Sequence, residues 1–330
     1  MIDHLFSLKN TFKYIHCTQE NTSLIHIGYG IDNNYVRCTA ASIASICLNN
    51  PKRYFSFYII TNGISNNNLD KFNRLASIYS INIIIFEIDG TCLKNLPTKS
   101  YLPLATYFRF ILPMLLDNID KLFYIDADII CLKSADELFD VDLKDNIIAA
   151  VPDLEWLGKK RTRALNLQDH IYFNAGLLAI NMKKWLASDI LSKVINCITK
   201  EPAKFQYLDQ DALNLILTGK IFYLSRKFNY IYNNGSISKD IIFFHFAAHP
   251  KPWAISYSLC DREKLFANIA PYQYYEDKTP WKNTLPDLPS NYKEMEFYSK
   301  CLKKKKRYKE SFHWYLKYLI AKFKYLTKTK

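Results

Sequence analysis

Between residues 24 and 132 the sequence alternates regularly between apolar, strand-like runs and helical segments, and this alternation constrains the fold most. Strands that alternate with helices favour a largely parallel sheet with helices on its faces, an architecture that binds nucleotides at the carboxyl ends of its strands. We therefore expect an α/β protein with a Rossmann-like core. The strands are predicted at 24–30, 54–61, 82–88 and 121–132, and the helices at 35–48, 68–79 and about 106–116.

After Lys121, the fourth of these strands is apolar except for two carboxylates, Asp126 and Asp128. Side chains alternate between the two faces of a strand, so both carboxylates would share one face. Like charges repel there, and a hard divalent cation such as Mg²⁺ or Mn²⁺, which also binds substrate phosphates, would resolve the conflict. The pair predicts a metal-diphosphate site at a strand end, with a solvated loop start as the alternative.

Two further Asp-x-Asp tripeptides have different surroundings, and about one is expected by chance in a chain of this length. The tripeptide at 140–142 has no apolar strand before it. The one at 209–211 opens a predicted helix, where aspartates interact favourably with the helix dipole. Only the pair at 126–128 follows a buried strand that would hold it rigidly, so the metal site is assigned there.

The first strand also ends in polar residues. Asp32 and Asn34 follow it directly, and parallel strands place their carboxyl ends on one rim of the sheet. The sequence Gly28-Tyr29-Gly30 lacks the third glycine of the dinucleotide fingerprint. We therefore expect a nucleotide site in which side chains recognise the base and the ribose.

His245 ends a short apolar strand in the second half of the chain. It could meet the carboxylate pair at a strand end as a third metal ligand, and the alternative is an ordinary polar residue. The strands predicted in this half are 147–151, 172–180 and 241–244, with helices at about 183–198 and from residue 209.

Taken together, these motifs resemble the retaining glycosyltransferases of family 8, most of all the bacterial lipopolysaccharide core glucosyl- and galactosyltransferases. The resemblance covers about residues 24–255, and a shorter similarity continues through Pro280-Trp281 and residues 292–295. Six motifs in one order are far more specific than any one of them. They are Gly30-Ile-Asp-Asn-Asn-Tyr35, Ala105-Thr-Tyr-Phe-Arg109, Phe123-Tyr-Ile-Asp-Ala-Asp128, Tyr172-Phe-Asn-Ala-Gly176, Asp209-Gln-Asp211, and His245 through Lys251-Pro-Trp253.

The resemblance implies a single domain of the GT-A type with a mostly parallel, mixed sheet. It implies that Asp126, Asp128 and His245 bind Mn²⁺ or Mg²⁺, which bridges the diphosphate of a UDP-sugar, and that Asp209 and Gln210 act in catalysis. The positions that match the family's donor-binding residues are Gly30, Asp32, Asn34, Tyr35, Arg109, Asp126, Ala127, Asn174, Ala175 and Lys251.

The activity that the resemblance implies is transfer of glucose or galactose from a UDP-sugar to a sugar of the lipopolysaccharide core, with retention of configuration. UDP is a poor leaving group unless its charge is neutralised, which a metal and Lys251 would achieve. A double displacement needs a nucleophile. Gln210 is a poor nucleophile and Asp209 is expected only to bind sugar hydroxyls, so a same-face, ion-pair-like substitution is favoured.

Two other functions stay open at this point. A sugar nucleotidyltransferase would also use a nucleotide and Mg²⁺, but it usually has a Gly-rich phosphate loop near the N-terminus, which this sequence lacks. A peripheral-membrane or nucleic-acid binding module with an inactive sugar-nucleotide fold would bind no UDP in a metal-dependent manner. The sequence departs from the family at Ala247-Ala248-His249, where a Gly is usual; if that Gly needs a positive φ or close backbone approach to phosphate, Ala248 makes the contact less favourable.

The net charge of +13 lies mostly in the C-terminal segment. Residues 291–330 hold twelve Lys and one Arg against three Glu, or +10, which leaves +3 for the rest. A basic, aromatic, amphipathic helix from Ser311 is typical of binding to an anionic membrane surface, and the alternative is a helix packed on its own domain. No nucleic-acid motif occurs, so nucleic acid is not an expected partner. The apolar face would hold Phe312, Tyr315, Leu316, Leu319, Ile320, Phe323 and Leu326, with Lys317 and Lys324 off it and Lys322 near its edge.

The 330 residues fit one large domain with an appendage. We expect an N-terminal extension at 1–22, a GT-A type domain at 23–270, and a helical, basic, membrane-associating region at 271–330. No apolar run approaches about 20 residues, and no signal-peptide pattern occurs. Eight scattered cysteines without a C-x-x-C pair fit reduced thiols. The expected location is the cytoplasm, peripheral on the inner membrane.

Overall fold

The computed structural model describes residues 6–20, 23–93, 96–98, 104–116, 118–167, 170–233, 237–260, 266 and 269–328. The strands of its large sheet are β1 (Ser7–Ile15), β2 (Leu24–Ile31), β3 (Tyr54–Thr61), β4 (Asn82–Asp89), β5 (Lys121–Ile125), β7 (Ile148–Pro152), β8 (Phe173–Asn181) and β9 (Ile221–Tyr223). Their order is β1-β4-β3-β2-β5-β8-β7-β9. β4, β3, β2 and β5 are parallel, whereas β1 and β8 run antiparallel to the strands beside them. The expected mixed, mostly parallel sheet is confirmed.

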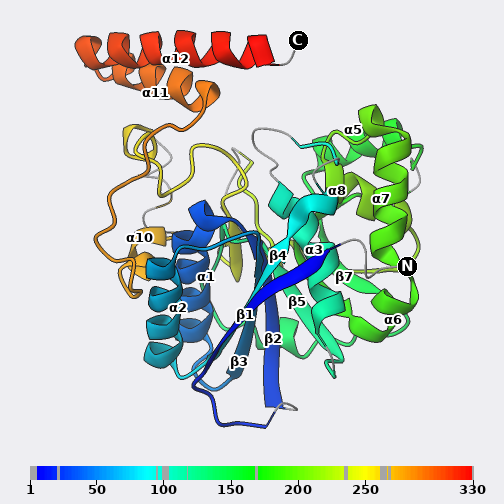
Figure 1. Ribbon diagram of the computed structural model, residues 1–330. Coiled ribbons are helices and arrows are strands. Elements are labelled where there is room, and N and C mark those ends of the chain that lie inside the picture. Colours follow the sequence, from blue (N-terminus) through cyan, green and yellow to red (C-terminus); the bar gives the residue numbers. More distant parts are fainter. Residues whose placement is uncertain are drawn as a thin grey trace.

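Helices cover both faces of this sheet (Figure 1). α1 (Val36–Asn49) and α2 (Asn66–Tyr79) bury their apolar side chains against one face, and α6 (Met182–Ala187) and α7 (Ile190–Lys200) against the other. α1 is buried along most of its length because small residues predominate in it. The remaining helices are α3 (Phe108–Ile111), α4 (Asp136–Phe139), α5 (Glu155–Leu165), α8 (Leu208–Ile216), α10 (Tyr272–Glu276), α11 (Tyr292–Lys304) and α12 (Tyr308–Lys328).

The strand expected at 121–132 is two strands separated by a turn. β5 ends at Ile125, a turn follows at 126–128, and β6 (Ile129–Cys131) begins after it. The two aspartates therefore lie in a turn and not on one face of a continuous strand, which is where the sequence analysis placed them. β6 instead pairs with β10 (Phe243–His245) in a second, two-stranded sheet, which places His245 opposite the first residue of β6.

Two predicted helices are interrupted. The helix expected at 183–198 is divided into α6 and α7 near Asp189, which has a left-handed backbone with φ of 46°. The helix expected at about 106–116 consists of short turns, and Pro113 lies in the last of them, a 3-10 turn. Proline lacks the amide hydrogen that a continuous helix requires.

The segment expected as an N-terminal extension includes β1. This strand adds an antiparallel edge to the sheet, with Ser7 opposite Asp89 and Ile15 opposite Asn82. Residues 7–15 therefore belong to the central sheet, and a boundary at residue 22 would divide that sheet.

The C-terminal helices α11 and α12 lie side by side at the end of the molecule beyond the sheet (Figure 1). Ser299 and Ser311 join them by reciprocal hydrogen bonds of 2.8 and 2.9 Å from each hydroxyl to the other's carbonyl oxygen. The segment before α11 is held to α1 by Arg37, whose buried guanidinium pairs with Glu276 at 2.6 Å and bonds to Asp287 at 3.0 Å. Within the described ranges no helix has the length and apolar character that crossing a membrane requires.

Candidate active site

A cleft of about 540 Å³ opens where β2, β5 and β7 end. The carboxyl ends of these strands share one rim of the sheet, which is where ligands bind in such folds. Asn34 is exposed and is not one of the residues that line the cleft. The cleft brings together the other residues proposed from sequence: Gly30, Asp32, Tyr35, Arg109, Asp126, Ala127, Asp128, Asn174, Ala175, Asp209, Gln210, His245 and Lys251.

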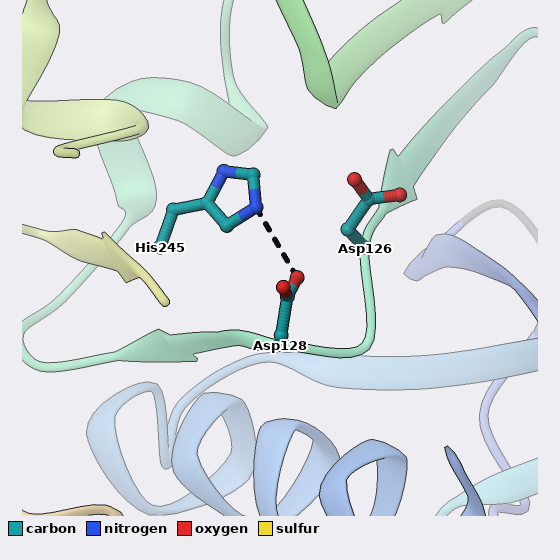
Figure 2. A group of neighbouring side chains, drawn as sticks. All are labelled: Asp126, Asp128 and His245. Atoms are coloured by element: carbon teal, nitrogen blue, oxygen red, sulfur yellow. Dashed lines mark ion pairs between the residues drawn. The ribbon is translucent and has the colours of Figure 1, made fainter. Parts of the chain in front are cut away.

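Asp126, Asp128 and His245 lie close together, and Asp128 faces His245 (Figure 2). One ligand atom from each lies within 4.8 Å of the others. Nε2 of His245 is 3.2 Å from Oδ1 of Asp128, and Nδ1 on the far side of the ring is 2.9 Å from Oδ1 of Asn229. Two carboxylates and an imidazole oriented by a hydrogen bond on its other nitrogen form a donor set that suits Mn²⁺ or Mg²⁺. The residues present therefore fit a divalent cation.

Lys251 is buried beside this cluster. Its Nζ donates to Oδ2 of Asp128 and to the carbonyl oxygen of Phe246, both at 2.6 Å. Burial alone would raise the pKa of Asp128, but the charge of Lys251 and the contact with His245 outweigh it and hold that pKa below its ordinary value. Asp128 is therefore ionised and able to ligate a cation.

Arg109 links the cluster to Asp209. Its side chain is 5% exposed, and the guanidinium lies 2.9 Å from Asp126 Oδ1 and 3.0 Å from Asp209 Oδ2. A hydrogen bond of 2.5 Å goes to the carbonyl oxygen of Ala175, and the ring of Tyr124 lies 4.6 Å from the guanidinium carbon. Burial raises the pKa of Asp209 to about 6; Arg109 opposes the rise and the charge of Asp126 adds to it.

The side-chain amide of Gln210 is held at both ends. Its Oε1 accepts from Nδ2 of Asn174 and from the backbone N–H of Ala175, each at 3.1 Å. Its Nε2 donates to Oδ2 of Asp153 at 2.9 Å and to the hydroxyl oxygen of Tyr172 at 3.1 Å. The amide is therefore fixed in the cleft, and its oxygen is committed to two donors.

Gly30 is required by close packing at the mouth of β2. A Cβ there would lie 2.9 Å from Cβ of Phe108 and 3.1 Å from both the carbonyl oxygen of Ala105 and the hydroxyl of Tyr124. In the loop where the family usually has a Gly, Ala248 does not have a positive φ. Alanine therefore adopts the backbone conformation of this loop without strain.

Several residues that line or support the cleft were not proposed from sequence. Asp153 directly follows β7, and the rule that placed Asp32 after β2 would have found it. Trp156, on α5, lines the cleft with 56% of its side chain exposed. Asn229 belongs to an irregular segment, and no sequence pattern marks it.

Comparison with known families decides the classification. Residues 26–256 match the family model described as glycosyl transferase family 8, and residues 266–322 match the one described as glycosyl transferase family 8 C-terminal. The chain belongs to this family. The second match shows that the family 8 resemblance extends through α11 and most of α12.

Relatives in family 8 cover nearly the whole chain. The chain is 31% identical over 333 residues to "Lipopolysaccharide 1,3-galactosyltransferase" of Salmonella typhimurium, with 96% of each covered. It is 29% identical to "Lipopolysaccharide glucosyltransferase WaaO" of Escherichia coli, over 96% of this chain and 97% of the relative.

A solved structure confirms the fold. The structure of the galactosyltransferase LgtC in complex with donor and acceptor sugar analogues matches with a TM-score of 0.68 at 23% identity, over 80% of this chain and 98% of that one. The family 8 chain described here therefore has the GT-A-like fold expected from its sequence.

Proposed function

We propose that this chain transfers glucose or galactose from a UDP-sugar to a sugar of the lipopolysaccharide core, with retention and in dependence on Mn²⁺ or Mg²⁺. The observation that carries the proposal is the convergence of Asp126, Asp128 and His245 in one cleft with Asp209 and Gln210. The names of the relatives support a hexose donor and a lipopolysaccharide acceptor.

In the proposed complex, Asp126, Asp128 and His245 hold the cation. A divalent cation bound there would act as a Lewis acid and neutralise charge on the leaving diphosphate. The ammonium group of Lys251, buried beside Asp128, adds a fixed positive charge to the same part of the cleft. Fixed charges of this kind stabilise the charge that develops as the sugar departs.

Retention is best explained by substitution on the same face of the sugar. A double displacement needs a free nucleophile beside the sugar. The carboxylate of Asp209 is paired with Arg109, and the oxygen of Gln210 accepts two hydrogen bonds. These two side chains are therefore suited to orienting the sugar and stabilising positive charge on it.

We also propose that α12 binds an anionic membrane surface, where a lipid-linked acceptor would lie. Its seven apolar residues named above are all more than 40% exposed, so much of this face is open to solvent. The surrounding segment carries +10. Exposed aromatic and aliphatic side chains beside basic residues suit the interface of an anionic bilayer.

The test of the transferase proposal is UDP release by purified protein with Mn²⁺, comparing UDP-glucose, UDP-galactose and UDP-N-acetylglucosamine. We expect metal-dependent release from one hexose donor, increased by truncated lipopolysaccharide, and its loss in Asp128→Asn. Asp142→Asn is the matched control, because Asp142 belongs to another Asp-x-Asp tripeptide, accepts from the backbone N–H of Lys144 and does not line the cleft. No release from any donor, with or without acceptor, would refute the proposal.

A further inference from the structure

Asn229 has no part in the proposed donor site. Its side-chain amide nevertheless lies between His245, a proposed metal ligand, and Asn174, which contacts Gln210. It follows the 3-10 turn Arg226–Phe228 and is 4% exposed. Its Oδ1 lies 2.9 Å from Nδ1 of His245, and its Nδ2 donates to Oδ1 of Asn174 at 2.8 Å. Both ends of this buried amide are therefore engaged.

A backbone amide fixes the direction of these hydrogen bonds. The N–H of Gly176 donates to Asn174 at 2.9 Å, and because an amide N–H can only donate, the atom of Asn174 that accepts is its oxygen. Asn229 must then present its NH₂ group to Asn174 and its oxygen to His245. Nδ1 of His245 therefore carries a hydrogen, and in the neutral ring the lone pair lies on Nε2, which faces Asp128.

The same hydrogen-bonded chain continues to Gln210. The N–H of Ala175 fixes the oxygen of Gln210 in the same way, and that oxygen also accepts from Nδ2 of Asn174 at 3.1 Å. Asn174 thus accepts from Asn229 and donates to Gln210. Two buried asparagines connect the imidazole at the metal site to the amide that faces the sugar pocket.

We propose that Asn229 is a positioning residue: it holds His245 as the Nδ1–H tautomer with Nε2 directed at the metal, and it ties this ring to the amide of Gln210. The inference rests on the proposed metal-dependent function. Partners that orient a metal-binding imidazole typically change metal affinity or activity by about 10- to 100-fold. Asn229 therefore contributes to metal affinity although it is not a ligand.

Two substitutions of Asn229 distinguish its contact with His245 from its contact with Asn174, because one removes both contacts and the other removes only the second. Asn229→Leu removes both, and Mn²⁺ affinity, measured by electron paramagnetic resonance of unbound Mn²⁺, should fall by about 10- to 100-fold. Asn229→Asp keeps an acceptor for Nδ1–H but cannot donate to Asn174. Its Mn²⁺ affinity should stay close to wild type while kcat falls. Thermal unfolding checks that both variants fold, and Gln210→Ala is the control that should lower kcat without weakening Mn²⁺ binding.

A measurement on the wild-type protein does not depend on any variant of Asn229. Nitrogen-15 NMR of the metal-free protein reports whether Nδ1 of His245 carries a hydrogen, with His245→Gln identifying its signals. A hydrogen on Nδ1 is expected, whether or not Nε2 also carries one. A hydrogen on Nε2 alone would overturn the proposal, as would a folded Asn229→Leu variant with wild-type Mn²⁺ affinity. If the wild-type protein binds no Mn²⁺, the metal-dependent function fails instead, and the tautomer still decides the role of Asn229.

Discussion

A Cβ on Gly176 would stand 2.5 Å from Cε1 of His245 and 2.9 Å from its Nδ1. The absence of a side chain on this residue of β8 is what allows the imidazole to lie against the strand. The carbonyl oxygen of the same glycine accepts from the backbone N–H of Asp126 at 2.7 Å. Gly176 thus positions two of the three proposed metal ligands, one by its size and one by its backbone.

Gly176→Ala should weaken metal binding for this reason. The imidazole must move to admit the methyl group, and we expect Mn²⁺ affinity to fall by about 10- to 100-fold, with a loss of about 1–3 kcal/mol in the free energy of unfolding. Titration of Mn²⁺ by electron paramagnetic resonance measures the first effect. Gly158→Ala is the matched control, because a Cβ there would lie 3.6 Å from Cβ of Tyr172, an ordinary contact. Equal Mn²⁺ affinity in the Gly176 variant and the control would contradict this prediction.

Activity should depend on the ionisation of Asp209. With a pKa of about 6, this carboxyl takes up a proton as the pH falls through that value and no longer carries the charge that pairs with Arg109. We expect kcat/KM for the UDP-sugar to fall below about pH 6, and the residual activity of Asp209→Asn to lack this fall. A cation bound at Asp126 cancels a charge that raises this pKa, so saturating Mn²⁺ should move the midpoint to lower pH. A profile of the same form in the variant would rule out Asp209 as its source.

Ionisation of Asp209 should lower the stability of the folded protein, although activity is expected to require it. Its pKa of about 6 in the folded protein is above that of an unfolded Asp, near 3.9. The stability that it contributes is therefore fully present below about pH 4 and is lost as the pH rises through about 6. The thermal midpoint of Asp209→Asn should lack this part of the pH dependence, which scans at several pH values would reveal.

Gln210→Ala should retain measurable turnover. If the sugar is transferred by same-face substitution, Gln210 orients the donor and forms no bond to it, so kcat should fall while the KD for UDP stays near its wild-type value. Turnover and calorimetric UDP binding, measured on the same preparation, test this. Complete loss of turnover with normal donor binding would instead favour a covalent role.

The buried pair of Arg37 and Glu276 should be important for stability. The two side chains are 5% and 0% exposed, so removing the cation leaves a carboxylate buried without its partner. Arg37→Met should lower the free energy of unfolding by about 3–5 kcal/mol, measured by denaturant titration. Arg53→Met is the control: its ion pairs with Asp136 and Asp140 are largely exposed, and about 1 kcal/mol or less is expected. Similar losses in the two variants would refute this account.

The central strands could be predicted because burial on both faces gives continuous apolar runs. β3 occupies the residues predicted for it, 54–61, and every residue after Tyr54 in that strand is buried. The edge strand β1 could not be predicted. Most of its side chains are exposed, so it has no apolar period, and its place in the sheet depends on backbone pairing with β4.

The site could be predicted where the type and sequence position of its residues indicate their function. Asp126 and Asp128 belong to one tripeptide, and His245 ends a strand, so their type and position indicated a cluster that the structure brings together. Asn229 gave no such signal, and Gly176 was named only as the last residue of the motif at 172–176, with no role of its own. Their roles arise from contacts with residues 16 and 69 positions along the chain, and a single sequence does not contain those distances.

The exposed apolar face of α12 leads to a last prediction. Phe312 and Phe323 are 63% and 69% exposed, so replacing both with Ser should leave the fold intact. If the face inserts into a bilayer, the loss of two phenyl groups should weaken binding to vesicles that contain anionic phosphatidylglycerol by about tenfold or more, as measured by flotation of the full chain. Leu285→Ser, which alters a residue outside α12 that is 82% exposed, is the matched control and should bind as the wild type does. Binding should also weaken as salt is raised, because the Lys-rich segment supplies the electrostatic part of the attraction. Equal flotation of the double variant and the control would mean that α12 is not the membrane-binding surface.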